Sequence, residues 1–129
     1  MSNNLNKSER LSGKTTIDKL FTGGKSKSFF PIKVQYRMVE ASANSEKASV
    51  LFVVPKRNIK RAVDRNLLKR RMRESYRLNK TILAFPEGFN KKLQFSLLYL
   101  TKDIVEYEEI NRKILLILSY LNEHLKKDN

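Results

Sequence analysis

The strongest constraint on the fold is an apolar stripe in the segment from Tyr107 to Lys127. Its large aliphatic residues recur every three or four positions, a spacing that places them on one side of an α-helix. Glutamates stand where this helix would begin and lysines where it would end, which suits the helix dipole at both termini. We therefore predict a long amphipathic helix. Its stripe consists of Ile110, Ile114, Ile117, Leu118, Leu121 and Leu125.

Three upstream segments have the patterns of strands. From Phe30 to Val39 apolar and polar side chains alternate, which predicts a half-buried strand. Ser49 to Val54 is continuously apolar and predicts a fully buried strand, which Pro55 ends. Leu93 to Leu100 has a mixed pattern and predicts a third strand. The segment 85–88, Phe-Pro-Glu-Gly, predicts the turn before it.

Two further helices complete the expected order. A short one runs from about Lys14 to Phe21, and Gly23 and Gly24 stop it. A longer one runs from about Asn58 to Leu78. We expect residues 1–8 to be a disordered tail and residues 9–127 to form one α/β domain.

The charge of the chain limits its function. Its 27 Lys and Arg residues outnumber 13 Asp and Glu residues, so the formal net charge is +14. So positive a chain of 129 residues points to a polyanionic partner, with nucleic acid in the lead. No apolar run is long enough to cross a bilayer, and the polar start has no signal-peptide core. The absence of cysteine is compatible with the cytoplasm, where we expect the protein.

The positive charge is concentrated in one segment. Residues 56–77 carry ten basic and two acidic side chains, whereas residues 102–129 carry five basic and six acidic ones. In a helix, the basic residues of this segment share an arc of about 100°, away from the apolar side formed by Leu68, Met72 and Tyr76. We call the residues of this arc the basic row: Asn66, Lys69, Arg70, Arg73 and Arg77, with Arg65 at its border.

A row of guanidinium groups suits a row of phosphates, since arginine offers planar, bidentate donors. The amide of Asn66 can both donate and accept, which suits a base edge, a ribose hydroxyl or a hydrated metal ion. A charged run can also be a solvated helix face. Such faces usually alternate Glu with Lys, whereas this one stacks like charges and therefore favours nucleic-acid binding.

The segment from Arg61 to Glu74 resembles the signature helix of bacterial ribonuclease P proteins. The family pattern is Ala-Val, any residue, Arg-Asn, two residues, Lys-Arg, two residues, Arg-Glu, and every fixed position is matched. Val53 to Arg57 resembles the family's strand end followed by two basic residues. Arg10-Leu11, residues 17–21 and Gly24 resemble its opening helix. The resemblance covers roughly residues 9 to 125.

The resemblance implies a two-layer α-β-β-β-α-β-α sandwich, similar to the second domain of certain ribosomal proteins. It also implies a left-handed β-α-β crossover, an exception to the usual right-handed rule. The patterns above give one strand fewer, which we attribute to a break within Phe30 to Glu40. Three positions depart from the family. Leu67 replaces its usual Arg, so one RNA contact is missing or supplied by Arg71; Ile59-Lys60 replaces a stretch with Gly; Ile17 stands where aromatic residues are typical.

The resemblance further implies a role in processing precursor tRNA. A catalytic RNA partner would hold Mg²⁺ and remove the 5′ leader by hydrolysis of a phosphodiester bond, with one protein per RNA and no catalytic or metal-binding residue in this chain. A cleft would hold the single-stranded leader on Ile17, Phe21 and Tyr36, since aromatic faces stack unpaired bases; from spacing alone, Phe21 and Tyr36 are equally compatible with core packing. The candidate RNA-binding residues are Lys56, Arg57, Arg61, Arg65, Asn66, Lys69, Arg70, Arg73 and Arg77.

Several residues and motifs that could suggest a catalytic or metal site do not meet its requirements. Residues 12–15, Ser-Gly-Lys-Thr, lack the earlier glycine of a phosphate-binding loop. The single histidine, His124, fits a solvated helix end. Asp64 and Glu74 are too far apart along a helix for one two-metal site. The acidic cluster from Asp103 to Glu109 is explained by the helix dipole.

Three other functions remain open at this stage: a ribosomal or structural RNA-binding protein, a duplex DNA binder that places the helix in a major groove, and a free-standing nuclease. The residue inventory gives the nuclease little support.

Overall fold

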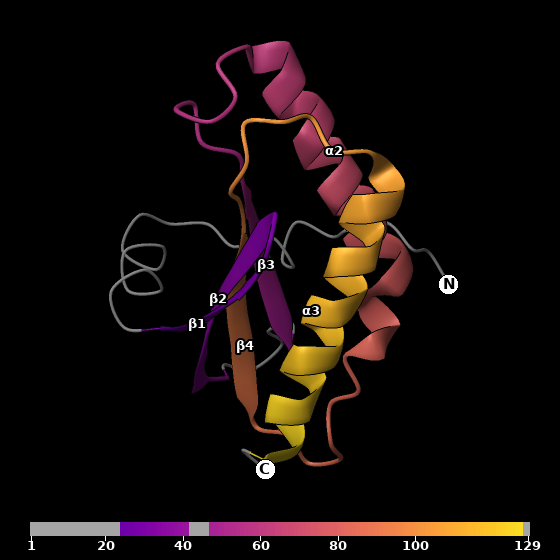
Figure 1. Ribbon diagram of the computed structural model, residues 1–129. Helices are drawn as coiled ribbons and strands as arrows, with labels where there is room; N and C mark the ends of the chain where they lie inside the picture. Colours follow the sequence, from indigo (N-terminus) through magenta and orange to yellow (C-terminus); the bar gives the residue numbers. More distant parts are fainter. Residues whose placement is uncertain (1–23, 42–46, 128–129) are drawn as a thin grey trace.

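The computed structural model describes residues 24–41 and 47–127, which form a four-stranded sheet with two helices on one face (Figure 1). The predicted tail, residues 1–8, and the predicted helix at Lys14 to Phe21 lie outside the described residues. The elements are β1 (Lys25–Phe29), β2 (Ile32–Glu40), β3 (Ala48–Val53), α2 (Ala62–Asn79), the short 3₁₀ helix η2 (Lys80–Ile82), β4 (Lys91–Tyr99) and α3 (Tyr107–Lys127).

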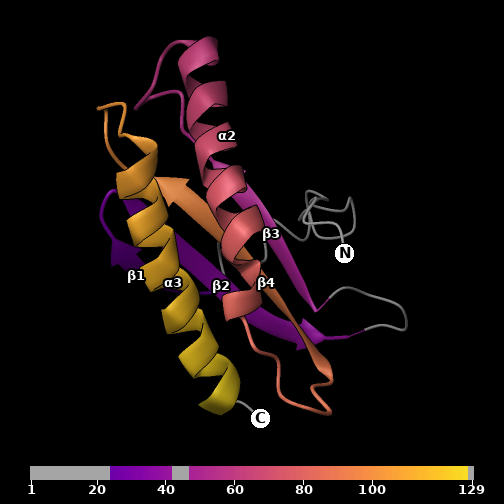
Figure 2. The ribbon, with the colours of Figure 1, turned by 90° about the vertical axis from the view of Figure 1, so that its right-hand side faces the viewer.

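The sheet has the strand order β1-β2-β4-β3, with β3 and β4 parallel and the other neighbours antiparallel. The chain leaves β3, passes through α2 and returns to the sheet in β4. Seen from the helix side in Figure 2, β4 lies to the left of β3 while both strands run upward, so this crossover is left-handed. The α/β fold class that the resemblance implied is thereby confirmed over the described residues.

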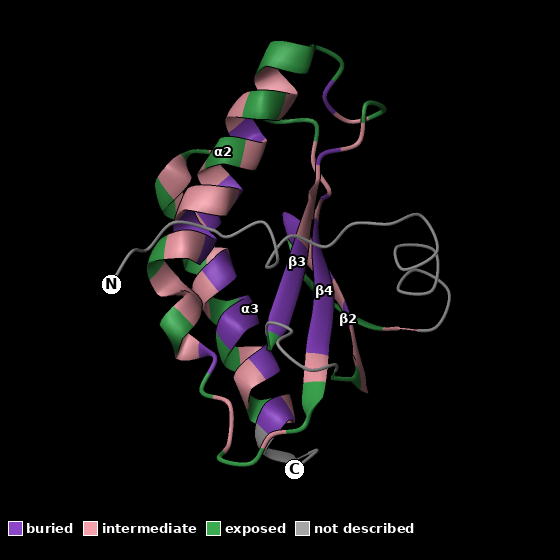
Figure 3. Ribbon diagram, turned by 180° about the vertical axis from the view of Figure 1, so that it is seen from behind, coloured by how far each residue is buried: buried purple, intermediate pink, exposed green. Residues whose placement is uncertain are grey.

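The core lies between the sheet and the helices. Alternate residues of β2 face the helices, and the register places Ile32 beside Tyr99, Val34 beside Leu97 and Tyr36 beside Phe95. All six residues of the predicted α3 stripe are buried against this face. Figure 3 shows the buried residues gathered on the strands and on the inner sides of the helices. The periodicities of β2 and α3 were thus sufficient to predict which side of each element is buried.

The strand that the sequence patterns did not predict lies outside the segment in which we expected it. We expected a break within Phe30 to Glu40, but the additional strand is β1, which lies upstream of that segment. The segment of β1 reads Lys-Ser-Lys-Ser-Phe, and its first four residues are exposed. Because β1 is an edge strand with little apolar burial, it lacks the alternation by which a strand is recognised.

The strand β3 is only half as buried as predicted. Ala48, Ser49 and Val50 are buried, whereas Leu51, Phe52 and Val53 are half-buried. The strand lies at the other edge of the sheet, where β4 is its one neighbouring strand. A continuous apolar run therefore did not mean full burial here.

The helix α2 begins four residues later than predicted, at Ala62. The amides of Asn58 and Ile59 both donate to the carbonyl of Pro55, at 3.1 Å, which closes a turn. Ile59 is buried, and Arg61 has extended backbone angles. Burial of the Ile59 side chain thus holds residues 56–60 as a loop, although their side chains suit a helix.

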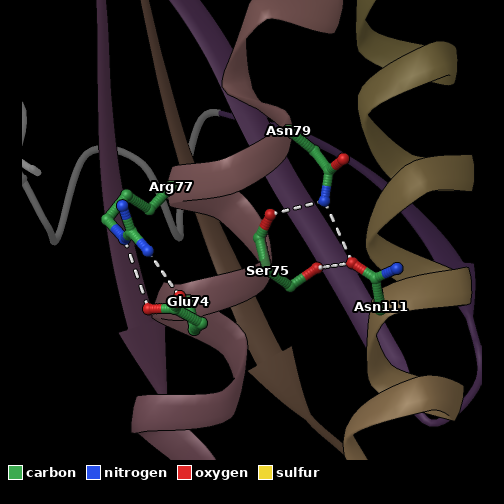
Figure 4. Close-up of polar contacts among 5 residues, drawn as sticks. All are labelled: Glu74, Ser75, Arg77, Asn79 and Asn111. Carbon is green, nitrogen blue, oxygen red and sulfur yellow. Dashed lines mark hydrogen bonds and ion pairs between the residues drawn. The ribbon is translucent and has the colours of Figure 1, made fainter. Parts of the chain in front are cut away.

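Polar contacts fix α2 against α3 on the side of α2 that faces its neighbour. The side-chain carbonyl of Asn111 accepts hydrogen bonds from the Ser75 hydroxyl, at 2.7 Å, and from the Asn79 amide, at 3.0 Å (Figure 4). The guanidinium of Arg71 donates to the carbonyl of Val105 at 2.7 Å. These contacts decide which side of α2 remains open to a partner.

Candidate nucleic-acid interface

The basic residues that the sequence singled out occupy two adjoining elements. Lys56 and Arg57 are exposed on the loop that precedes α2, and Arg61 is the residue that caps the helix. The side chain of Arg61 is 78% exposed. Arg65 and the basic row follow on α2 itself. Loop and helix thus form one run of cationic side chains.

The basic row lies on the side of α2 away from α3. At 100° per residue, the row is centred nearly opposite the side that carries Arg71 and Ser75, the residues bonded to the α3 side of the molecule. Three buried residues lie between these two sides and belong to the core: Leu68, Met72 and Tyr76. The packing of α2 therefore turns the basic row outward, as its helical spacing predicted.

Most of the basic row has no carboxylate partner in the part of the chain that the structure describes. Among residues 24–41 and 47–127, none of Lys69, Arg70 and Arg73 forms an ion pair. Asn66 and Arg70 are exposed, and Lys69 and Arg73 are half-buried. The guanidinium of Arg73 lies over the ring of Phe52 in β3, 5.9 Å from its centre, which gives this long side chain a direction. These four residues can therefore meet an anionic backbone without first breaking an internal ion pair.

Arg77, the last member of the basic row, differs from the others. Its guanidinium makes a bidentate ion pair with Glu74, with donor–acceptor distances of 2.5 and 3.2 Å (Figure 4). The hydrogen bond from Arg77 lowers the pKa of Glu74, and the same bond raises the pKa of Arg77. The positive charge of the row is thus compensated at its C-terminal end, whereas Lys69, Arg70 and Arg73 have no ion-pair partner within the described ranges.

Arg65 points back toward the loop. Its guanidinium donates to the carbonyls of Ile59, at 2.9 Å, and Lys60, at 2.7 Å. On the other side of the loop, the side-chain amide of Asn58 donates to the carbonyl of Tyr99 at 3.1 Å. Sequence reasoning did not single out Asn58, and no local pattern indicates it, because its partner lies 41 residues away.

Neither Leu67 nor Arg71 belongs to the open side of the basic row. Leu67 is half-buried and lies between the row and the α3 side of the helix. The alternative that Arg71 supplies the missing arginine contact meets an obstacle, since its guanidinium is bonded to the Val105 carbonyl. A contact by Arg71 in place of the family's arginine therefore remains a prediction.

Of the three residues predicted to line a leader cleft, Ile17 and Phe21 lie outside the described residues. Tyr36 is 5% exposed and lies on the helix-covered face of the sheet. Its hydroxyl is hydrogen-bonded to that of Tyr120 at 2.9 Å, and its ring packs edge-on against Tyr120 and His124. The core alternative therefore describes its position, whereas Gln35, next to it in β2, points to the other face. A leader contact by Tyr36 remains a prediction.

His124 packs against an aromatic neighbour, and the described acidic residues are not grouped as a metal site requires. The ring of His124 packs at a tilt against Tyr120, with centres 4.4 Å apart, and its Nδ1 is hydrogen-bonded to the Tyr120 carbonyl. His124 is therefore half-buried rather than simply solvated. Within the described ranges no group of three or more His, Asp or Glu residues is placed to hold a metal ion. Neither α2 nor α3 is long and apolar enough to cross a membrane.

The fold and this surface define a class of protein: a small, basic α/β domain with one cationic surface of the kind that binds nucleic acid. The family model described as ribonuclease P matches residues 5–115. The chain belongs to the ribonuclease P protein family.

Individual relatives agree with this assignment. The ribonuclease P protein component of Chlorobium phaeobacteroides is 35% identical over 122 residues, which cover 87% of this chain and 84% of the relative. That of Porphyromonas gingivalis is 42% identical over 79 residues, which span 61% of this chain and 57% of the relative's length.

Solved structures also match. The RNase P protein of Thermotoga maritima superposes with a TM-score of 0.68 at 25% identity, covering 87% of this chain and 96% of that one. The Staphylococcus aureus protein, at 18% identity, shares the fold with a TM-score of 0.65, covering 89% of this chain and 96% of its own.

Proposed function

We propose that this chain is the protein subunit of a ribonuclease P ribonucleoprotein, which removes the 5′ leader from precursor tRNA. In this role the chain binds the catalytic RNA, in a one-to-one complex, and helps to hold the leader. The observation that carries the proposal is the group of cations on the loop and on the basic row, of which Lys69, Arg70 and Arg73 form no ion pair within the described residues. Each phosphate that such a surface neutralises releases condensed counterions and so favours binding.

We place hydrolysis, and the Mg²⁺ that it requires, in the RNA partner. The two carboxylates of α2 support this division because arginines engage both of them. Asp64 is 3.8 Å from Arg61, and Glu74 is bonded to Arg77. The chain's own contribution is then to position RNA and to screen its charge, through the loop and through the basic row.

Reconstitution tests this division of roles. Purified protein freed of nucleases should not cleave precursor tRNA in the presence of Mg²⁺. Addition of the ribonuclease P RNA of the same organism should give a mature 5′-phosphate end and a leader with a 3′-hydroxyl, at moderate salt where the RNA alone is slow. Cleavage by the RNA-free protein would contradict the proposal, as would failure of the protein to stimulate the RNA.

Two binding experiments separate the proposal from the other functions. Sedimentation at stringent salt should leave the protein apart from ribosomal subunits, whereas a ribosomal protein would co-migrate with them. Competition between structured RNA and duplex DNA of equal length should favour the RNA.

The leader contact has its own test. Phe21→Ala should weaken binding of precursor tRNA more than that of mature tRNA, because only the precursor carries the leader. Tyr36→Phe, which keeps the packed ring, provides the matched control and should change neither affinity. Equal losses for precursor and mature tRNA in Phe21→Ala would remove Phe21 from the leader site.

A further inference from the structure

The loop that precedes α2 carries an unusual density of positive charge for a segment with so fixed a backbone. Its exposed cations are Lys56, Arg57 and Lys60, and Arg61 follows at the start of the helix. Like charges at such short spacing repel one another, and a free loop would separate them. The loop is nonetheless anchored from both sides.

One anchor is the guanidinium of Arg65. A single nitrogen of this group, Nη1, donates to the Ile59 carbonyl at 2.9 Å and to the Lys60 carbonyl at 2.7 Å. Both carbonyls belong to the loop residues immediately before the helix. A charged donor shared by two carbonyls makes stronger bonds than a neutral donor would. Arg65 therefore draws the end of the loop onto the first turn of α2.

The second anchor lies on the sheet side of the loop. The Asn58 amide donates to the carbonyl of Tyr99, and the Ile59 side chain between the two anchors is 4% exposed. Tyr99 is itself held in place, since its hydroxyl donates to the Asp103 carbonyl and accepts from the Val105 amide. The loop thus bridges the end of β4 and the start of α2.

We propose that Arg65 is a positioning residue: it acts on RNA through the loop cations, by fixing residues 56–60 beside the basic row, and not through a phosphate contact of its own. Fixing these cations before binding removes the entropy cost of ordering them on the RNA. The proposal rests on the RNA-binding role proposed above, because the effect it describes is an effect on RNA affinity.

A double-mutant cycle tests the proposal with ribonuclease P RNA as the probe. The first background is the wild-type loop, and the second is a neutral loop with Lys56→Gln, Arg57→Gln and Lys60→Gln. In the wild-type loop, Arg65→Ala should weaken RNA binding about tenfold, as expected for coupled neighbours. In the neutral loop the same substitution should weaken binding less than about twofold, because the cations through which Arg65 acts are gone.

Arg70→Ala is the matched control, since Arg70 is exposed and belongs to the basic row. Its loss of affinity should be the same in both backgrounds. An equal loss for Arg65→Ala in both backgrounds would identify Arg65 as a direct contact and overturn the proposal. A wild-type protein that does not bind the RNA at all would instead overturn the RNA-binding role itself, so the two failures are distinguishable.

Asn58→Ala provides a second variant that changes no charge. It releases the loop from the Tyr99 carbonyl and leaves Arg65 in place. Its effect on affinity should also be present in the wild-type loop and absent in the neutral loop. Circular dichroism and thermal unfolding of each variant separate loss of the fold from loss of the loop. Unchanged RNA affinity in folded Asn58→Ala and Arg65→Ala would contradict a positioning role.

Discussion

The two helices α2 and α3 cover the same face of the sheet, yet they use their charged residues in opposite ways. In α3, Glu109 is bonded to Arg112 at 2.7 Å and lies 3.9 Å from Lys113, so positive and negative charges are balanced within the helix. In α2, Asn66, Lys69, Arg70 and Arg73 follow one another on one side, and of this row Arg77 alone is paired with a carboxylate among the residues that the structure describes.

The two helices also differ in how much of their surface is buried, and α3 is the more buried of the two. The α3 stripe is fully buried and extends over the whole length of the helix, whereas α2 buries only Leu68, Met72, Ser75 and Tyr76. Repulsion among the cations of α2 opposes folding, and burial of α3 stabilises the domain that carries them. We therefore expect α3 to contribute mainly to stability and α2, in the proposed function, mainly to RNA binding. Each of the following substitutions tests that division.

The largest expected effect concerns the stability that α3 supplies. Ile114→Ala removes a fully buried side chain from the stripe, and should lower the free energy of unfolding by about 2–5 kcal/mol. Leu116→Ala on the same helix is the control, because Leu116 is 46% exposed; its effect should stay within about 0.5 kcal/mol. Chemical denaturation monitored by circular dichroism measures both. Equal losses would contradict the assignment of the buried side.

The next effect concerns the RNA binding that we propose for α2. Arg70→Ala combined with Arg73→Ala should weaken binding to ribonuclease P RNA by about 30- to 100-fold, since each would remove a proposed phosphate contact. The wild-type log–log slope of affinity against salt should be about −3 to −5, and the double variant should flatten it by about 1 to 2.

The matched control for this double variant is Arg112→Ala with Lys113→Ala, which removes two positive charges from α3. Its affinity and salt slope should remain close to those of the wild type. Titrations of fluorescent RNA at several salt concentrations measure both quantities. If the α3 variant flattens the slope as much as the α2 variant, net charge rather than the basic row determines docking.

A smaller effect is expected where the two helices meet. Asn111→Ala removes the carbonyl that accepts from Ser75 and Asn79, and it leaves the buried Ser75 hydroxyl without that acceptor. The free energy of unfolding should fall by about 1–3 kcal/mol. Ser119→Ala, on the exposed side of α3, is the control. A neutral outcome for Asn111→Ala would mean that apolar packing alone sets the position of α2.

The smallest effect concerns Glu74, the acid that pairs with Arg77 of the basic row. Glu74→Gln removes the ion-pair partner of Arg77, so RNA affinity at low salt should rise about two- to threefold. Glu109→Gln makes the same change on α3 and should leave affinity unaltered. A rise of equal size in both variants would show that the location of the acid does not matter.

The same pair of variants has a pH dependence with a defined sign. The pKa of Glu74 is lowered by its bond to Arg77, so the ionised carboxylate stabilises the folded state. That contribution is present above the ordinary carboxyl pKa and disappears as pH falls through the lowered value. Melting temperatures of wild type and Glu74→Gln should therefore differ near neutral pH and converge in acid, as should those of Glu109→Gln, whose carboxyl pKa Arg112 lowers.

Much of the fold was predictable because the signals are local. The predicted bounds of α3 agree with those observed, Tyr107–Lys127, and the alternation of β2 gave its buried side correctly. Strand β1 was missed because exposed Lys and Ser residues on an edge strand show no alternation. The Arg77–Glu74 pair was also missed, although its spacing of three residues on a helix is a local signal.

The sequence by itself determined that the chain has a long amphipathic helix, a family signature and a row of cations on one side of a second helix. Only the tertiary structure decided which of those cations remain open to a partner. The partners of Arg71 and Asn58 lie 34 and 41 residues away, at Val105 and Tyr99. Contacts across such distances depend on how the sheet and helices pack together, because periodicity describes one element at a time.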